Sequence, residues 1–135
     1  MIVLDASVLI AHLDGRDVHH ERATQLLAES GGERLGASTI SLAETLVAPA
    51  RSGRLADATA ALERLSVTEL PLGDKASEHL AQLRADAGCK LPDCCVLLAA
   101  REHRATIASF DAALIDAAGA LGLAILTASS RSVSS

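Results

Sequence analysis

Short apolar runs alternate with helical patterns along the chain, and this alternation constrains the fold more than any other sequence feature. Such runs are typical of parallel strands that are buried on both faces. The order predicts an α/β three-layer sandwich, with a central, mostly parallel five-stranded sheet and helices on both faces. The expected strands are Ile2–Asp5, Arg34–Ser38, Val67–Leu70, Ala105–Ser109 and Leu123–Leu126. The expected helices are Ser7–Leu13, Val18–Glu29, Ile40–Ala48, Leu55–Leu65, Lys75–Ala87, Asp93–Arg104 and Asp111–Ala120.

The chain has 135 residues, of which 50% are hydrophobic, so it is long enough and apolar enough to bury one core. The sequence contains neither an internal repeat nor an interdomain linker. We therefore expect one domain over residues 1–128, followed by a frayed, Ser-rich tail over residues 129–135. The apolar runs are too short to cross a bilayer, and the sequence begins without a processing signal, so we expect a cytoplasmic protein with no membrane contact.

The charge balance weighs against a protein that holds nucleic acid by bulk electrostatics. The chain has 12 basic and 17 acidic residues, which gives a net charge of −5. Phe110 is the only Phe, Tyr or Trp, so we expect a core anchor there and no stacking platform for bases. These facts do not exclude a nuclease whose bound metal ions supply the local positive charge.

Three cysteines lie close together in sequence, at Cys89, Cys94 and Cys95. Their number is odd and their spacing lacks paired CxxC units, which argues against a disulfide framework or a zinc knuckle. Cys94 and Cys95 fall in an apolar helical segment, where free cysteine packs as a small hydrophobic side chain.

Four acidic residues, Asp5, Glu44, Asp93 and Asp111, stand alone in apolar segments at strand ends or early in helices. A carboxylate in apolar surroundings is unfavourable unless it is paired or binds a metal, and few cationic partners lie nearby in sequence. Every strand-to-helix turn of such a sheet meets the same edge, so the topology can bring all four together. Carboxylate oxygens suit Mg²⁺, with Mn²⁺ as substitute, and such a site can hydrolyse phosphodiester bonds.

Each acid also has a simpler interpretation. Asp5 and Asp111 are good helix N-caps, and Asp93 suits the positive end of a helix dipole. Glu44 lies on an apolar stripe with Ile40, Ala43 and Val47, although a solvent-facing glutamate is the ordinary alternative. The quartet favours the metal site over four separate structural roles.

Four segments resemble the PIN domain, and the full length resembles the toxin ribonuclease of a VapBC-type toxin–antitoxin pair. The segments are Val3–Ala11, Ser41–Glu44, Leu91–Cys94 and Ala108–Leu114. The resemblance implies an endoribonuclease that depends on Mg²⁺ or Mn²⁺ and is blocked by a small DNA-binding antitoxin. It also implies a homodimer, for which the helices at Ile40–Ala48 and Leu55–Leu65 offer apolar faces.

The resemblance assigns roles residue by residue. It makes Asp5, Glu44, Asp93 and Asp111 the metal-binding and catalytic carboxylates. Ser7 and Ser109 correspond to hydroxyl positions beside that quartet, although the family often has threonine where this chain has Ser109. From the residues alone, Arg16, Lys90, Arg51 and Arg54 could contact RNA phosphates, although ordinary solvated surface is the favoured interpretation of each. Lys90, three residues before Asp93, is the most suggestive of them.

Two other classes compete with this one, and the first, a phosphatase or phosphoryl receiver on a similar sheet, fits poorly. A phosphatase of the haloacid-dehalogenase type needs a second aspartate at the position of Ser7, and a phosphoryl receiver needs an acidic pair after the first strand; this sequence has neither. The remaining alternative is a non-catalytic PIN-like scaffold that binds protein or RNA without cutting it.

Overall fold

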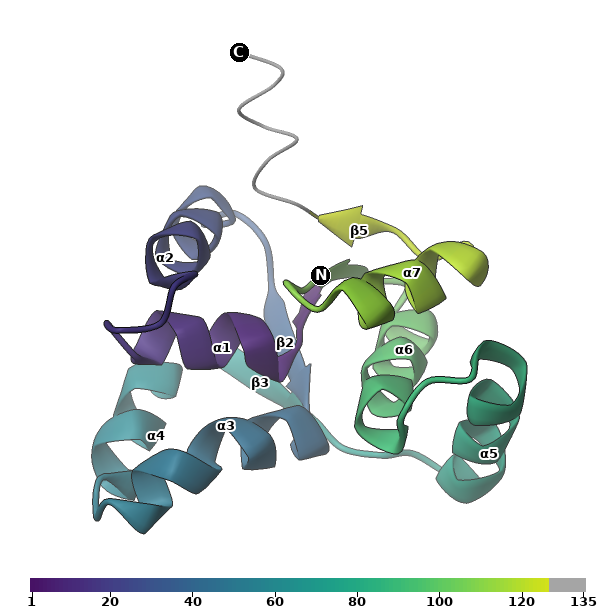
Figure 1. The fold of residues 1–135 in the computed structure, drawn as a ribbon, viewed down its shortest axis with the longest axis horizontal. Coiled ribbons are helices and arrows are strands. Elements are labelled where there is room, and N and C mark those ends of the chain that lie inside the picture. Colours follow the sequence, from purple (N-terminus) through teal and green to yellow (C-terminus); the bar gives the residue numbers. More distant parts are fainter. Residues whose placement is uncertain (127–135) are drawn as a thin grey trace.

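A parallel five-stranded sheet lies at the centre of the molecule, between two sets of helices (Figure 1). The computed structural model describes residues 1–126. The strands are β1 (Ile2–Leu4), β2 (Leu35–Ser38), β3 (Val67–Leu70), β4 (Thr106–Ala108) and β5 (Ile125–Leu126). The helices are α1 (Ala6–Leu13), α2 (His20–Glu29), α3 (Thr39–Arg51), α4 (Leu55–Arg64), α5 (Ala76–Ala87), α6 (Leu91–His103) and α7 (Ala112–Ala120). The α/β sandwich predicted from the sequence is confirmed.

The strand order is β3-β2-β1-β4-β5, and every neighbouring pair is parallel. In register, Val3 lies opposite Gly36 of β2 and opposite Ile107 of β4. Strand β1 is therefore central, with the strands that precede α3 and α7 on its two sides. Because all strands run in one direction, the turns that follow β1, β2 and β4 meet at one edge of the sheet.

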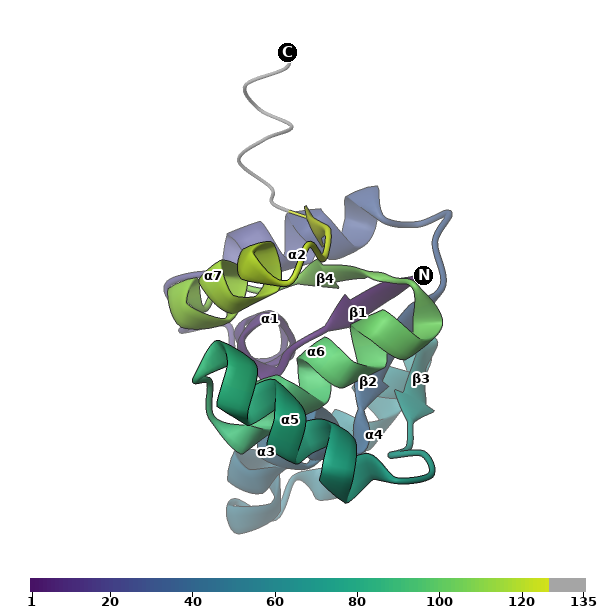
Figure 2. The same cartoon turned by 90° about the vertical axis from the view of Figure 1, so that its right-hand side faces the viewer.

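Alternating side chains along the strands form two separate cores. Val3 and Ile107 belong to the first core, which includes side chains of α5, α6 and α7. Leu4 and Ala108 belong to the second, which includes side chains of α1, α2 and α4. In Figure 2, α5 and α6 lie in front of the sheet and α1 lies behind it. Both faces of the central strands are thus covered.

Two local features differ from the sequence prediction. Strand β3 is an edge strand in which Thr68 and Glu69 are exposed, so burial on both faces was a wrong expectation for this strand. Helix α3 continues past Ala48 and through Pro49 to Arg51. Pro49 lacks the N–H that would bond to the Thr45 carbonyl, and the helix ends two residues after it.

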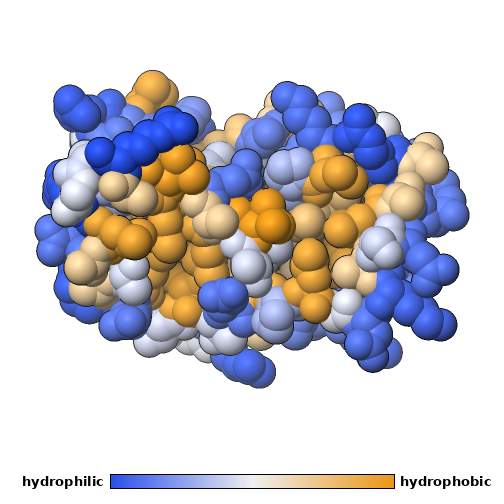
Figure 3. All heavy atoms as spheres, turned by 90° about the horizontal axis from the view of Figure 1, so that it is seen from below, coloured by the Kyte–Doolittle hydropathy of each residue, from blue (hydrophilic) through white to orange (hydrophobic). Residues whose placement is uncertain are grey.

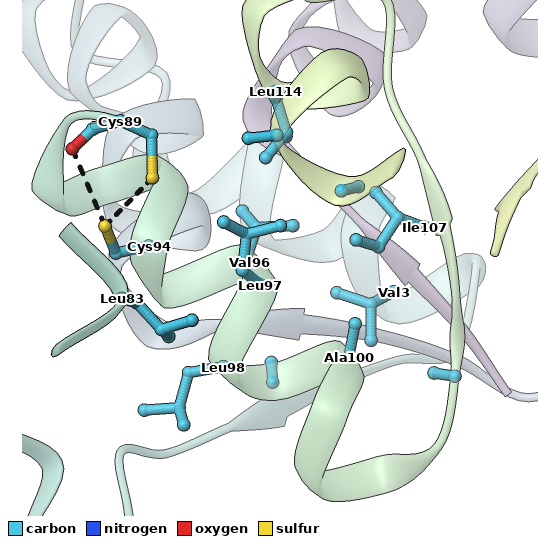
Figure 4. Close-up of a cluster of buried hydrophobic side chains, with 14 of the residues drawn as sticks. Val3, Leu83, Cys89, Cys94, Val96, Leu97, Leu98, Ala100, Ile107 and Leu114 are labelled. Carbon is cyan, nitrogen blue, oxygen red and sulfur yellow. Dashed lines mark hydrogen bonds between the residues drawn. The ribbon is translucent and has the colours of Figure 1, made fainter. Parts of the chain in front are cut away.

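The three cysteines are buried free thiols. Cys89 lies two residues before α6, and Cys94 and Cys95 lie near its start. Figure 4 shows the Cys94 thiol directed at Cys89, with 3.1 Å between the two Sγ atoms. Burial and this hydrogen bond raise the pKa of the Cys94 thiol to about 12, while burial and the charge of Glu44 raise the pKa of Cys95. Protonated, buried thiols pack as small apolar groups, as expected.

The segment over residues 129–135, predicted to be a frayed tail, lies outside the residues that the structure describes. Within residues 1–126, none of the helices is long and apolar enough to cross a bilayer.

Leu97 is fully buried in the first core, beside Val3 and Ile107 (Figure 4). Leu97→Ala should lower the free energy of unfolding by about 2–5 kcal/mol, because it removes buried methyl groups and leaves a cavity. Urea denaturation followed by circular dichroism measures the change. Leu72→Ala is the control, because Leu72 is 41% exposed and its truncation should cost far less. Equal losses in the two variants would contradict this account of the core.

Candidate active site

Four carboxylates approach one another at the carboxyl edge of the central strands. Asp5 follows β1 and caps α1, and Asp111 caps α7 after β4. Asp93 lies in the first turn of α6, and Glu44 lies on α3. The charge of Asp5 acts on both Glu44 and Asp93, and the charge of Asp111 acts on both Asp5 and Asp93. The structure therefore brings together the quartet that the sequence singled out.

Asp5 is the most constrained of the four. Asp5 is only 5% exposed, and both of its carboxylate oxygens accept hydrogen bonds. Oδ1 accepts from the Ser7 hydroxyl at 2.6 Å and from the Val8 amide at 3.3 Å, and Oδ2 accepts from the Ser109 hydroxyl at 2.6 Å. These donors fix the position of a carboxylate that burial would otherwise disfavour.

The two serines also hold the backbone at Asp111, the acidic residue that follows Ser109 and Phe110. The Ser109 hydroxyl accepts a hydrogen bond from the Asp111 amide at 2.9 Å, and the Ser7 hydroxyl accepts one from the Phe110 amide at 3.0 Å. The side chain of Asp111 accepts in turn from the Ala113 and Leu114 amides at the start of α7. Asp5, Ser7, Ser109 and Asp111 thus form one connected network, in which Asp5 and Asp111 are both helix N-caps.

Burial and mutual repulsion make three of the carboxylates harder to ionise. Burial raises the pKa of Asp5, and the charge of Asp111 adds to the rise, against the hydrogen bonds from Ser109, Ser7 and Val8. Reduced solvation raises the pKa of Glu44, and the charges of Asp93 and Asp5 act in the same direction. Burial raises the pKa of Asp93, and so do the charges of Asp111 and Asp5.

Lys90 is the exposed N-cap residue of α6. Its positive charge opposes the rise in the pKa of Asp93, so the ammonium group acts on the carboxylate cluster. Lys90 is therefore placed beside the quartet.

The donor set fits a hard divalent cation. It offers carboxylate oxygens whose mutual repulsion a cation would relieve, and proteins bind Mg²⁺ through one or two carboxylates together with several waters. Among the described residues, no three His, Cys, Asp or Glu side chains already stand as a preformed metal site. The fit therefore rests on the donor chemistry and on the electrostatic coupling of the four groups.

A groove of about 530 Å³ opens beside Glu44, between α1, α3 and α4. Ile10, Leu13 and Ala61 give it apolar walls. Its charged lining residues include Arg16, Arg54 and Arg64. The sequence offers Arg16, Arg51 and Arg54 as candidate phosphate contacts, with ordinary surface as the favoured role of each. The structure places Arg16 and Arg54 in the groove and adds Arg64, which sequence spacing gave no reason to select.

Phe110 was expected to be a core anchor, but it is only partly buried. It contacts the second core, and its ring is covered by two polar side chains from the start of α2, His19 and Arg22. Sequence reasoning missed this cluster, because its members lie about 90 residues apart and share no periodic pattern.

Comparisons with known proteins place the chain in a family. Residues 2–120 match the family model described as the PIN domain. A search of the curated proteins gives no significant match.

Among solved structures, VapC20 from Mycobacterium tuberculosis, described as a toxin that cleaves the sarcin-ricin loop, is 20% identical with a TM-score of 0.69. That match covers 94% of this chain and 99% of VapC20. FitAcB from Neisseria gonorrhoeae is 22% identical with a TM-score of 0.72, over 95% of this chain and 98% of the other. VapBC2 from Rickettsia felis, bound to a DNA fragment from its promoter, is 15% identical with a TM-score of 0.71. That match covers 93% of this chain and 98% of the other. At these identities the structures show a shared fold.

The family match covers most of the chain and agrees with the parallel sheet and its helices. The chain belongs to the PIN domain family.

Glu44→Gln should stabilise the protein in EDTA at pH 7–8. Folding raises the pKa of Glu44 above the ordinary glutamate value. The protein therefore loses stability as the pH rises from that ordinary value through the folded-state pKa, and at pH 7–8 the ionised group is a net cost. The neutral amide avoids the cost, and we expect a Tm higher by about 1–3 °C, since solvent screens part of the repulsion.

Differential scanning fluorimetry from pH 4 to pH 8 tests the sign. Below pH 4 the glutamate is protonated in both states and the difference should disappear. Glu63→Gln, on the exposed face of α4, is the control. A lower Tm for Glu44→Gln at pH 8 would show that the carboxylate is stabilised where it lies.

Proposed function

We propose that this protein is a metal-dependent endoribonuclease toxin, which hydrolyses RNA phosphodiester bonds and is neutralised by a cognate antitoxin. The observation that carries the proposal is the convergence of Asp5, Glu44, Asp93 and Asp111 in a chain of the PIN domain family. The free, buried thiols fit a reducing compartment, so we place the activity in the cytoplasm.

Asp5, Glu44, Asp93 and Asp111 are the residues that would hold Mg²⁺, or Mn²⁺ as a substitute. When bound, such an ion lowers the pKa of a water and neutralises charge on the phosphate. The chain's own contribution is positional. Ser7 and Ser109 hold the Asp5 carboxylate through its two oxygens, and Ser109 holds the backbone of Asp111.

The carboxylates also differ in their access to water. Asp5 is buried, whereas Glu44 is exposed beside the groove. Of these two, Glu44 would be the carboxylate to accept a proton from an attacking water at its Oε atoms, because water can reach it. Lys90 would contact a phosphate of the RNA beside Asp93.

The proposed antitoxin is a small DNA-binding protein. The groove between α1, α3 and α4 has apolar walls and includes Glu44 in its lining, so a segment bound there would cover one of the four carboxylates. The solved structures that share the fold include toxin–antitoxin complexes, among them one bound to promoter DNA. This support is for the partner class and not for its identity.

We further propose that two copies of the chain form a homodimer. On α3, Ala43 is exposed and Val47 is 44% exposed, and Leu55 at the start of α4 is 46% exposed. Figure 3 shows apolar side chains gathered on the lower face of the molecule, where α3 and α4 lie. Exposed apolar side chains of this kind favour a protein partner, and the family resemblance favours a second copy.

RNA cleavage by the purified chain tests the proposed activity. We expect cutting of RNA with Mg²⁺ or Mn²⁺ and none in EDTA. Asp5→Asn and Asp93→Asn should each reduce the rate at least about 100-fold, because each removes a charged ligand from the metal site. Asp116→Asn, on the exposed side of α7, is the matched control and should cut like the original protein.

Two further readouts separate the possible outcomes. Circular dichroism should show that the Asn variants keep their fold, and Mg²⁺ should raise the Tm of the original protein more than that of Asp93→Asn. Undiminished cutting by either Asn variant would overturn the assigned site. If the protein neither cuts RNA nor gains stability from Mg²⁺, the non-catalytic scaffold is the better description.

Light scattering at high protein concentration tests the homodimer. We expect twice the chain mass of 13.9 kDa, and Val47→Asp should shift the population to the monomer, because it places a charge in an apolar interface. Glu63→Gln is again the control. A monomeric mass for the original protein at high concentration would contradict the dimer.

A further inference from the structure

The chain's only Phe, Tyr or Trp ring lies against two side chains that carry or can acquire positive charge. The guanidinium carbon of Arg22 lies 4.8 Å from the ring centre of Phe110, and the His19 ring lies 4.9 Å from it at an angle of 33°. Arg22 Nη1 lies 3.3 Å from His19 Nδ1, within hydrogen-bonding distance. The three side chains form a compact stack, which we call the Phe110 stack.

The Phe110 stack adjoins the carboxylate site. Phe110 directly precedes Asp111, and its amide donates to the Ser7 hydroxyl that binds Asp5. The backbone on both sides of the ring is therefore held by the same serine network as the carboxylates. The ring therefore belongs to the residue directly before one of the four carboxylates.

Charge gives a reason for such a contact. The chain carries a net charge of −5, and its carboxylate cluster repels the phosphates that flank a reacting bond. Local cations must therefore hold the substrate. Arg22 is exposed, and its guanidinium carbon lies over the Phe110 ring, so the group is in contact with the ring and is also accessible from solvent. A guanidinium in such a place can stack on a base and face a phosphate at its edge.

The number of Phe, Tyr and Trp residues alone predicts no stacking platform for bases. That count omitted the planar groups of arginine and histidine, which stack on bases as aromatic rings do. One phenylalanine is enough when the fold brings an arginine and a histidine against it.

We propose that His19, Arg22 and Phe110 form a subsite for the nucleotide next to the cleaved bond of a single-stranded RNA. The base stacks on the exposed face of Arg22, and the guanidinium faces the adjoining phosphate. This inference rests on the proposed ribonuclease function and names residues that position its substrate. The bland alternative is that Arg22 and His19 only shield the Phe110 ring from water.

Binding of a fluorescein-labelled, mixed-sequence single-stranded RNA of ten nucleotides tests the subsite, with Ca²⁺ in place of Mg²⁺ to suppress cutting. Measured by anisotropy, Arg22→Ala should weaken binding about 5- to 20-fold, and Arg22→Lys should recover only part of the loss. The slope of log affinity against log salt should fall by about 0.7 in Arg22→Ala, because one phosphate contact is lost. A shielding role would move the Tm but would not move this slope.

Arg101→Ala, which removes an exposed arginine at the far end of α6, is the matched control and should bind like the original protein. With Mg²⁺, Arg22→Ala should raise KM and leave kcat within about twofold.

If the original protein cuts RNA and Arg22→Ala binds and cuts like it, the subsite is wrong and the ribonuclease stands. If the labelled RNA is bound but never cut, an Arg22→Ala binding defect supports the subsite while the ribonuclease fails. If the original protein does not bind the RNA, the subsite is overturned with it.

Discussion

The buried carboxylate of Asp5 is the constraint on which the site depends. At 5% exposure it needs hydrogen-bond donors, and it receives them from Ser7 and Val8 of α1 and from Ser109 after β4. Ser109 lies 104 residues away in sequence, so this bond requires β1 and β4 to be neighbours in the sheet. The register of those two strands is therefore also the geometry of the site.

The fold holds like charges together against their repulsion. The pKa values of Asp5, Glu44 and Asp93 are all raised, so each ionised group is less stable here than in water. Packing on both faces of the sheet offsets that cost, with Val3 and Ile107 in one core and Leu4 in the other. A site that is unfavourable when empty is well suited to bind a cation, because binding removes the repulsion.

Helix α3 connects the site with the surfaces proposed for partners. Glu44 is one of the four coupled carboxylates and also lines the groove, while Val47 on the same helix is exposed on the apolar face. A partner segment in the groove would therefore lie against a residue of the site. Inhibition by an antitoxin would follow from this overlap, without any change in the fold.

The sequence by itself determined the order of elements, the buried strands at the centre of the sheet and the local placement of the acids, because periodicity and helix capping act over a few residues. It indicated that Asp5 and Asp111 begin helices, and both do. The tertiary structure alone decided that β3 is an exposed edge, that the four carboxylates act on one another, and that His19 and Arg22 cover Phe110. These facts depend on which strands become neighbours. Strand pairing joins residues that are tens of positions apart, and its free energy is shared over the whole sheet, so no local pattern records it.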